Sequence, residues 1–187
     1  KEIRRNTVYE KAERMNPHYV GSRAFRVMFL RCNKYDVHAS ADQMLLFFEV
    51  KEELFGPNKL VKDITHDDLD EDDIACMKSG SIQLLGNDRS GSRMFLLLLG
   101  LRKFKVIENE LRCRYILTME ALQSEETQIR GSILLYYLVG KMKDSKKGFG
   151  LKNHLRLTNS LPLRRPGVHG CCDDLQQYLF IKAGIKA

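Results

Sequence analysis

Residues 133–138 (ILLYYL) form an unbroken run of large apolar and aromatic side chains, bracketed by Gly131 and Gly140. This run constrains the fold strongly, because it is far shorter than the roughly 20 apolar residues that a membrane-spanning helix needs. It also lacks the polar–apolar alternation of a strand with one face in water. β-Favouring residues between glycines are typical of a strand buried on both faces, as in a parallel sheet covered by helices. We therefore expect residues 131–140 to form a central strand.

A second run of the same kind, residues 94–99 (MFLLLL), lies between Gly91 and Gly100. A buried core helix could carry either run, but the glycine brackets favour strands. Residues 108–122, between the two runs, have helical spacing. Their apolar face would hold Leu111, Tyr115, Ile116, Met119 and Leu122, with Arg112, Arg114 and Glu120 elsewhere on the helix. A strand–helix–strand unit places its two strands parallel, with a right-handed crossover.

Helical periodicity dominates the chain before residue 60. Residues 22–32 have apolar side chains at helical spacing, and Asp36 is a candidate N-cap for the next helix, which would end at Gly56. We therefore expect a small all-helical N-terminal subdomain in residues 1–60, and residues 61–187 would form an α/β lobe.

The remaining elements of the lobe follow from shorter signals. Residues 81–85 are a strand candidate that could form a hairpin with residues 94–99 across a turn. Residues 151–161 are expected to be helical, Gly167 would begin a third parallel strand, and residues 175–183 would form a final helix. The fold class predicted by the sequence is α/β, with a mainly parallel sheet covered by helices.

The net charge of +7 is distributed unevenly along the chain. Residues 1–34 carry nine Lys/Arg against three Glu, and residues 35–73 carry three Lys against twelve Asp/Glu. A basic total permits nucleic acid or an anionic membrane surface as partner. Phe149 is the single aromatic beside the lysines of residues 141–147, so stacking on single-stranded nucleic acid is poorly supported and we expect no nucleic-acid partner.

Candidate chemistry is sparse. The sequence has no GxSxG, HExxH, CxxC or GxGxxG motif. His169, Cys171 and Cys172 lie close together, but their spacing matches no common zinc site. The acidic residues 68–72 resemble the start of a calcium loop, but the Gly and Glu that such a loop needs are missing. We expect a non-catalytic protein without metal or cofactor, and the five cysteines favour a reduced, cytoplasmic setting over a disulfide framework.

Four segments carry a set of related motifs. Residues 29–37 read FLRCNKYDV and residues 87–94 read NDRSGSRM; residues 115–131 combine a helix with TQIRG, and residues 161–169 read LPLRRPGVH. In this order they resemble the CRAL-TRIO lipid-binding family of the tocopherol- and retinaldehyde-transfer kind, whose motifs are FLRARKFDV, D-x-x-G-R-P-V, E-x-Q-x-x-G and PLR-x-x-G-[IV]-H. The family's central strand ends in an Asp where this chain has Tyr137. The family's lobe also runs on further, so the resemblance implies a lobe that is incomplete at its C-terminus.

The resemblance implies a sheet that floors an apolar pocket, where one phospholipid, tocopherol-like or retinoid-like molecule is bound and carried between membranes without chemistry. The residues implied to line the pocket are Phe95, Leu97, Tyr115, Met119, Leu134, Tyr136, Leu163 and Val168. Tyr137 would point away from the ligand, because side chains alternate along a strand. The residues implied to contact an anionic membrane or a phosphate are Arg31, Lys34, Arg164 and Arg165. Such a protein would be a monomer, cytoplasmic and peripheral at membranes.

Other interpretations stay open. A scaffold or regulatory domain could have this fold and bind no ligand, and a pocket filled by its own side chains would favour that interpretation. An α/β enzyme without a recognisable motif is a further alternative. The arginines could also pair with the acidic residues 67–73 and brace the two parts of the chain, instead of docking to a membrane.

Overall fold

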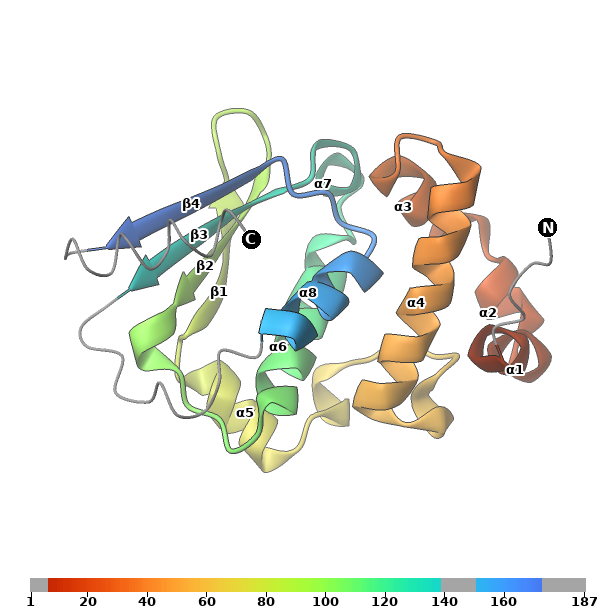
Figure 1. Ribbon diagram of the computed structural model, residues 1–187, viewed down its shortest axis with the longest axis horizontal. Helices are drawn as coiled ribbons and strands as arrows, with labels where there is room; N and C mark the ends of the chain where they lie inside the picture. Colours follow the sequence, from red (N-terminus) through yellow and green to blue (C-terminus); the bar gives the residue numbers. More distant parts are fainter. Residues whose placement is uncertain (1–6, 139–150, 173–187) are drawn as a thin grey trace.

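The computed structural model describes residues 7–138 and 151–172, and this part of the chain has an α/β fold (Figure 1). Its four-stranded sheet has the order β1-β2-β3-β4. The strands are β1 (Ile82–Asn87), β2 (Arg93–Leu98), β3 (Ser132–Leu138) and β4 (Gly167–Cys172). β1 and β2 form an antiparallel hairpin, whereas β2, β3 and β4 are parallel. The predicted class, hairpin and parallel pairing are therefore confirmed within the described residues.

The strand boundaries differ in detail from the expectation. β2 ends at Leu98, and Leu99 already begins a short 3-10 turn, η3 (Leu99–Leu101). The apolar run is longer than the strand because Leu99 is still buried as the chain turns away from the sheet. The lysines of residues 141–147 and the helix predicted at residues 175–183 lie outside the described residues.

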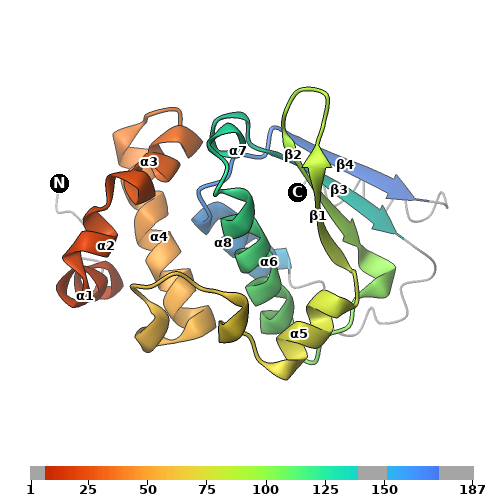
Figure 2. The ribbon, with the colours of Figure 1, turned by 180° about the vertical axis from the view of Figure 1, so that it is seen from behind.

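Two helices pack between the sheet and the N-terminal part of the chain. They are α6 (Ile107–Ala121) and α8 (Leu151–Ser160), and both views place them beside one face of the sheet (Figure 2). A short helix, α7 (Glu125–Arg130), connects α6 to β3 and contacts the N-terminal helices through α3.

The N-terminal part consists of α1 (Thr7–Met15), α2 (Pro17–Gly21), α3 (Arg23–Cys32) and α4 (Val37–Phe55). Their buried side chains form one hydrophobic cluster with residues of α6 and α8. The described elements within residues 7–59 are therefore all helices, but they share a core with the rest of the fold, and the separate N-terminal subdomain stays a prediction.

Helix α4 begins and ends where the sequence indicates. The carboxylate of Asp36 accepts a hydrogen bond of 3.0 Å from the backbone N–H of Ala39, which satisfies one of the free donors at the helix start. Gly56 ends the helix with φ 78°, a left-handed conformation that glycine adopts at little cost.

The acidic segment, residues 67–73, belongs to two short elements. The backbone N–H of Thr65 donates to Oδ2 of Asp68 over the 3-10 turn η2 (His66–Asp68), and α5 (Glu71–Lys78) starts separately. The side chain of Asp70 caps α5 by accepting a 2.8 Å hydrogen bond from the backbone N–H at position 73.

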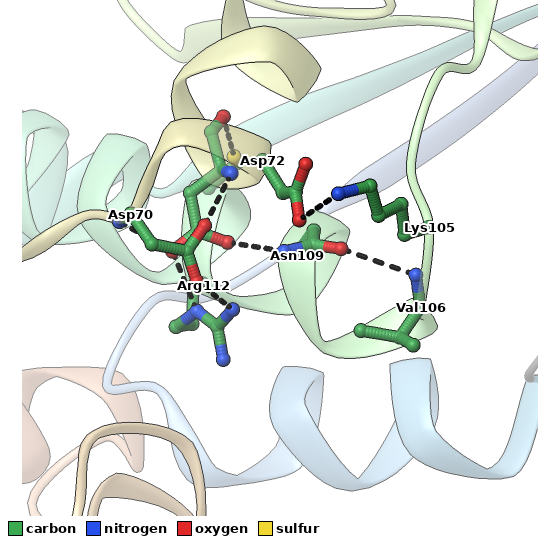
Figure 3. A network of polar contacts seen from close by, with 8 residues as sticks. Asp70, Asp72, Lys105, Val106, Asn109 and Arg112 are labelled. Carbon is green, nitrogen blue, oxygen red and sulfur yellow. Dashed lines mark hydrogen bonds and ion pairs between the residues drawn. The ribbon is translucent and has the colours of Figure 1, made fainter.

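A buried carboxylate fixes α5 against α6. Asp73 is 1% exposed, and it accepts 2.7 Å hydrogen bonds from Nδ2 of Asn109 and from Nε of Arg112. Arg112 also reaches Asp70 at 3.1 Å, so one guanidinium holds both ends of the first turn of α5 (Figure 3). A nearby pair, Asp72 with Lys105, is largely exposed.

This contrast gives a first prediction. Asp73→Ala leaves Asn109 and the Arg112 guanidinium without their buried acceptor, so we expect a loss of about 3–5 kcal/mol in the free energy of unfolding. Asp72→Ala removes a solvated pair and should cost less than about 1 kcal/mol. Urea denaturation of both variants measures this, and equal losses would contradict the assignment of Asp73 as the main link between α5 and α6.

Candidate functional site

Four of the residues expected to line a pocket form a packed core instead. Phe95, Leu97, Leu134 and Leu163 are between 1% and 7% exposed, and they lie in one hydrophobic cluster. Ala121 and Leu122, at the end of α6, belong to the same cluster. The space on this face of the sheet is therefore filled by side chains of the chain itself.

The other expected lining residues lie in different surroundings. Tyr136 packs, half-buried, against the sheet cluster, whereas Tyr115 belongs to the helical core, with its ring centroid 5.0 Å from that of Phe55. Met119 touches both clusters, and Val168 is 48% exposed. In the described residues this set does not border one cavity, because its members on the sheet pack under α6, and its role as a ligand site stays a prediction.

The opposite face of the sheet is also apolar, and we call it the outer face. Its side chains alternate with the buried ones: Met94, Leu96 and Leu98 on β2 stand in register with Ile133, Leu135 and Tyr137 on β3. All six are partly exposed. The resemblance assigned the ligand to the other set of alternating positions, so these residues were missed. The sequence did indicate that both faces of this strand are apolar, because the run at residues 133–138 has an apolar or aromatic side chain at every position.

A cavity of about 290 Å³ lies on the other side of α6, between that helix and residues 63–66. Two of the expected residues, Tyr115 and Met119, border it. Its full lining is Tyr19, Asp63, Ile64, Thr65, His66, Tyr115, Ile116, Met119, Glu120 and Gln123. Five of the ten lining residues are polar or charged, so this cavity differs from the uniformly apolar pocket that the resemblance implies.

A buried lysine lies behind the wall of this cavity. Lys51 is 0% exposed, and its Nζ donates to the hydroxyl of Tyr19 at 2.9 Å and to the carbonyl of Lys62 at 2.6 Å. Burial lowers the pKa of Lys51 to about 7, although Asp63 opposes the shift. The sequence contained the signal, because Lys51 follows Phe47 and Phe48 at helical spacing and so falls on the apolar stripe of α4.

The basic residues expected to contact a membrane, Arg31, Lys34, Arg164 and Arg165, lie in different surroundings, and Arg31 is already paired. Arg31 pairs with Glu125 and donates to Oε1 of Gln128 at 2.6 Å, and so links α3 to α7. The acidic segment has other partners, since Asp68 pairs with Lys59 and Lys62. The alternative in which the arginines pair with residues 67–73 therefore names the wrong partners for Arg31 and for Asp68.

Lys34 is exposed at the end of α3, in a turn with left-handed backbone. Lys34 has φ 53° and Tyr35 has φ 66°, and the backbone N–H of Tyr35 donates to the carbonyl of Leu30 at 2.7 Å. The turn displays two apolar side chains, because Tyr35 and Val37 are each 67% exposed.

Arg164 and Arg165 lie between α8 and β4, and both are half-buried. Nη1 of Arg165 donates to the carbonyl of Thr158 at 3.3 Å, and burial lowers the pKa of Arg165 to about 10, with the charge of Arg114 adding to the shift. Arg165 borders a cavity of about 340 Å³. Its lining is Asn33, Gln43, Thr158, Asn159, Leu163 and Arg165.

A buried polar group joins α6 to α8. The carboxylate of Glu110, which is 0% exposed, accepts a 3.0 Å hydrogen bond from Arg102 and lies 3.8 Å from Nε2 of His154. Arg114 hydrogen-bonds Nδ1 of His154, and because arginine only donates, the proton of this imidazole is on Nε2, facing Glu110. Burial, together with Arg114 and Arg102, lowers the pKa of His154 to about 3 and keeps it neutral.

Comparison with models of known protein families gives no match, and comparison with curated proteins gives none either. The resemblance to the CRAL-TRIO family therefore stays a prediction. Among the helices of residues 7–138 and 151–172, none is long and apolar enough to cross a bilayer.

The buried lysine gives a second prediction. Its pKa of about 7 in the folded protein lies below the ordinary value of 10.5, so the unfolded chain binds the extra proton between these two values. Stability should therefore rise between pH 7 and pH 9.5, by about 1–3 kcal/mol from this group.

Lys51→Met removes the titrating amine, so the variant should lose this rise, whereas Lys78→Met, at an exposed position on α5, should keep it. Urea denaturation at the two pH values provides the measurement. Parallel pH profiles for the wild-type protein and Lys51→Met would show that Lys51 does not titrate in this range.

Proposed function

We propose that this chain binds one hydrophobic small molecule, a phospholipid or a tocopherol- or retinoid-like isoprenoid, and carries it between membranes without chemistry. The observation that supports this most directly is the outer face of the sheet. Its six partly exposed side chains on β2 and β3 are all apolar or aromatic, on strands whose other face is already packed. A protein that needed these strands for its core alone could place polar side chains at the outer positions.

The energetics of such a site depend on apolar contact. Each CH₂ group of a ligand that leaves water for an apolar surface contributes about 0.8 kcal/mol. A long acyl or isoprenoid chain along two neighbouring strands therefore gains affinity from shape and area, with little need for charged groups. In this proposal the ligand contacts Met94, Leu96, Ile133 and Leu135, and the residues facing α6 support the strands from behind.

A ligand-free scaffold is the second candidate. The packed cluster around Leu134 favours it, because the face that the resemblance assigned to the ligand is filled by the chain's own side chains. The two candidates differ in one observable, which is whether lipid accompanies the purified protein.

Neighbouring residues on β3 provide the third prediction. Leu135→Trp adds bulk on the outer face, and we expect a folded protein that has lost most of its bound lipid. Leu134→Trp adds the same bulk to the packed core, so it should instead lower the free energy of unfolding by about 1–3 kcal/mol or more. Native mass spectrometry of the full chain, combined with urea denaturation, separates the two effects.

Two outcomes would count against the proposal. Unchanged lipid loading in Leu135→Trp would exclude the outer face as the binding surface. A wild-type protein that carries no lipid, and takes up none from vesicles, would favour the ligand-free scaffold.

The remaining part of this proposal is that the protein contacts an anionic membrane through Lys34. Arg31 is engaged with Glu125 and Arg165 with Thr158, whereas Lys34 is exposed beside Tyr35 and Val37. Aromatic side chains favour the membrane interface, and each basic residue near an anionic leaflet adds about 1 kcal/mol.

The fourth prediction tests this contact. Lys34→Glu should weaken binding to vesicles that contain phosphatidylserine by roughly tenfold at low salt, and less at physiological salt because of screening. Lys78→Glu makes the same charge change on α5, which lies along the lower edge of the molecule in both views, whereas the turn between α3 and α4 lies along the upper edge (Figures 1 and 2). Vesicle co-sedimentation measures both variants, and equal losses would indicate that net charge, and not this turn, governs binding.

A further inference from the structure

Two of the five cysteines lie together in the core between α5 and α6. Cys76 on α5 is 1% exposed and Cys113 on α6 is 0% exposed, and with Ile82 they form a separate hydrophobic cluster. Both are free thiols. Neither takes part in the proposed lipid site, since they lie on helices behind the packed face of the sheet.

The hydrogen bonds that join Asp73 of α5 to α6 lie next to the two thiols. Sγ of Cys113 donates to the backbone carbonyl of Asp73 at 3.3 Å, and Asp73 lies three residues before Cys76, one turn earlier on the same face of α5. The carboxylate of Asp73 is itself held by Asn109 and Arg112 at 2.7 Å each, from α6. Asn109, Arg112 and Cys113 of α6 therefore all reach the first turn of α5, one turn before Cys76, and Figure 3 shows the first two of them.

The two thiols have different acidities. The neighbouring thiol of Cys113 lowers the pKa of Cys76, despite the opposing effect of burial. The neighbouring thiol of Cys76, together with burial, raises the pKa of Cys113. Cys76 is therefore the thiol that ionises first, with a second thiol already in contact with it.

We propose that Cys76 and Cys113 are an oxidation site, at which a hydroperoxide converts the two thiols into a disulfide that joins α5 to α6. In the first step the Cys76 thiolate attacks one peroxide oxygen; the O–O bond breaks, a sulfenic acid forms on Cys76, and hydroxide leaves. In the second step the sulfur of Cys113 attacks the sulfenic sulfur, the S–O bond breaks, and water leaves with the proton of Cys113. Two thiols and one hydrogen peroxide thus give one disulfide and two waters.

The bond would form between parts of the chain that already touch, so it needs little rearrangement. Hydrogen peroxide is close to water in size, and it reaches such a site through local opening of the short helix α5. This inference does not rest on lipid binding, and the bond acts as a reversible covalent link between α5 and the central helix α6.

The test uses the reduced full-length protein under native conditions. It is treated with hydrogen peroxide, quenched with catalase, unfolded in an alkylating agent and digested for mass spectrometry. We expect a cross-linked peptide that contains Cys76 and Cys113 and disappears on treatment with dithiothreitol. Cys32, half-buried on α3, is the matched single thiol, and Cys32→Ser should leave the cross-link unchanged.

A second variant keeps the proposal testable if the cross-link is hard to detect. Cys113→Ser removes the resolving thiol, so the sulfenic acid on Cys76 should persist and react with dimedone, whereas Cys76→Ser should leave Cys113 unlabelled. The proposal is overturned if Cys76 and Cys113 both remain open to alkylation after a peroxide dose that oxidises the exposed Cys171. It is also overturned if Cys76 cross-links to Cys171 as readily as to Cys113.

Discussion

Burial of helix α6 on several sides is the constraint on which the rest of the structure depends. The helix contributes side chains to three hydrophobic clusters: Leu111 and Tyr115 to the helical core, Cys113 to the cluster with α5, and Ala121 to the cluster against the sheet. A helix buried in this way must also place its polar side chains inside. Glu110 is therefore fully buried, and its charge is balanced by Arg102 in a group that reaches α8.

The position of α6 also determines what the sheet can do. Because α6 packs on one face, the side chains of that face become core, and the alternating positions become the outer face. The six apolar side chains there contribute little to a core in the described residues, since all are partly exposed. Their composition is explained if the outer face binds an apolar ligand. The scaffold alternative explains these apolar side chains only if another part of the protein covers the outer face.

Local signals made much of the fold predictable, and contacts between distant residues limited the rest. The glycine-bracketed run at residues 133–138, the cap at Asp36 and the stop at Gly56 each act within a few residues, and each is where the sequence indicates. Arg114 was assigned to the outside of its helix, because its partner His154 lies 40 residues later. Strand alternation separates two sets of side chains but does not say which set the helices will cover, so the ligand face could not be assigned from sequence alone.

The central claim is that a hydrophobic ligand contacts the outer face of β2 and β3. A phospholipid with a photoreactive diazirine on its acyl chain tests this most directly, when it is loaded onto the wild-type chain, irradiated, and the labelled residues are mapped by mass spectrometry. We predict labels on Met94, Leu96 and Leu135, in competition with unlabelled lipid. Labels confined to the cavity residues around Met119, or an absence of competed labelling, would contradict the account.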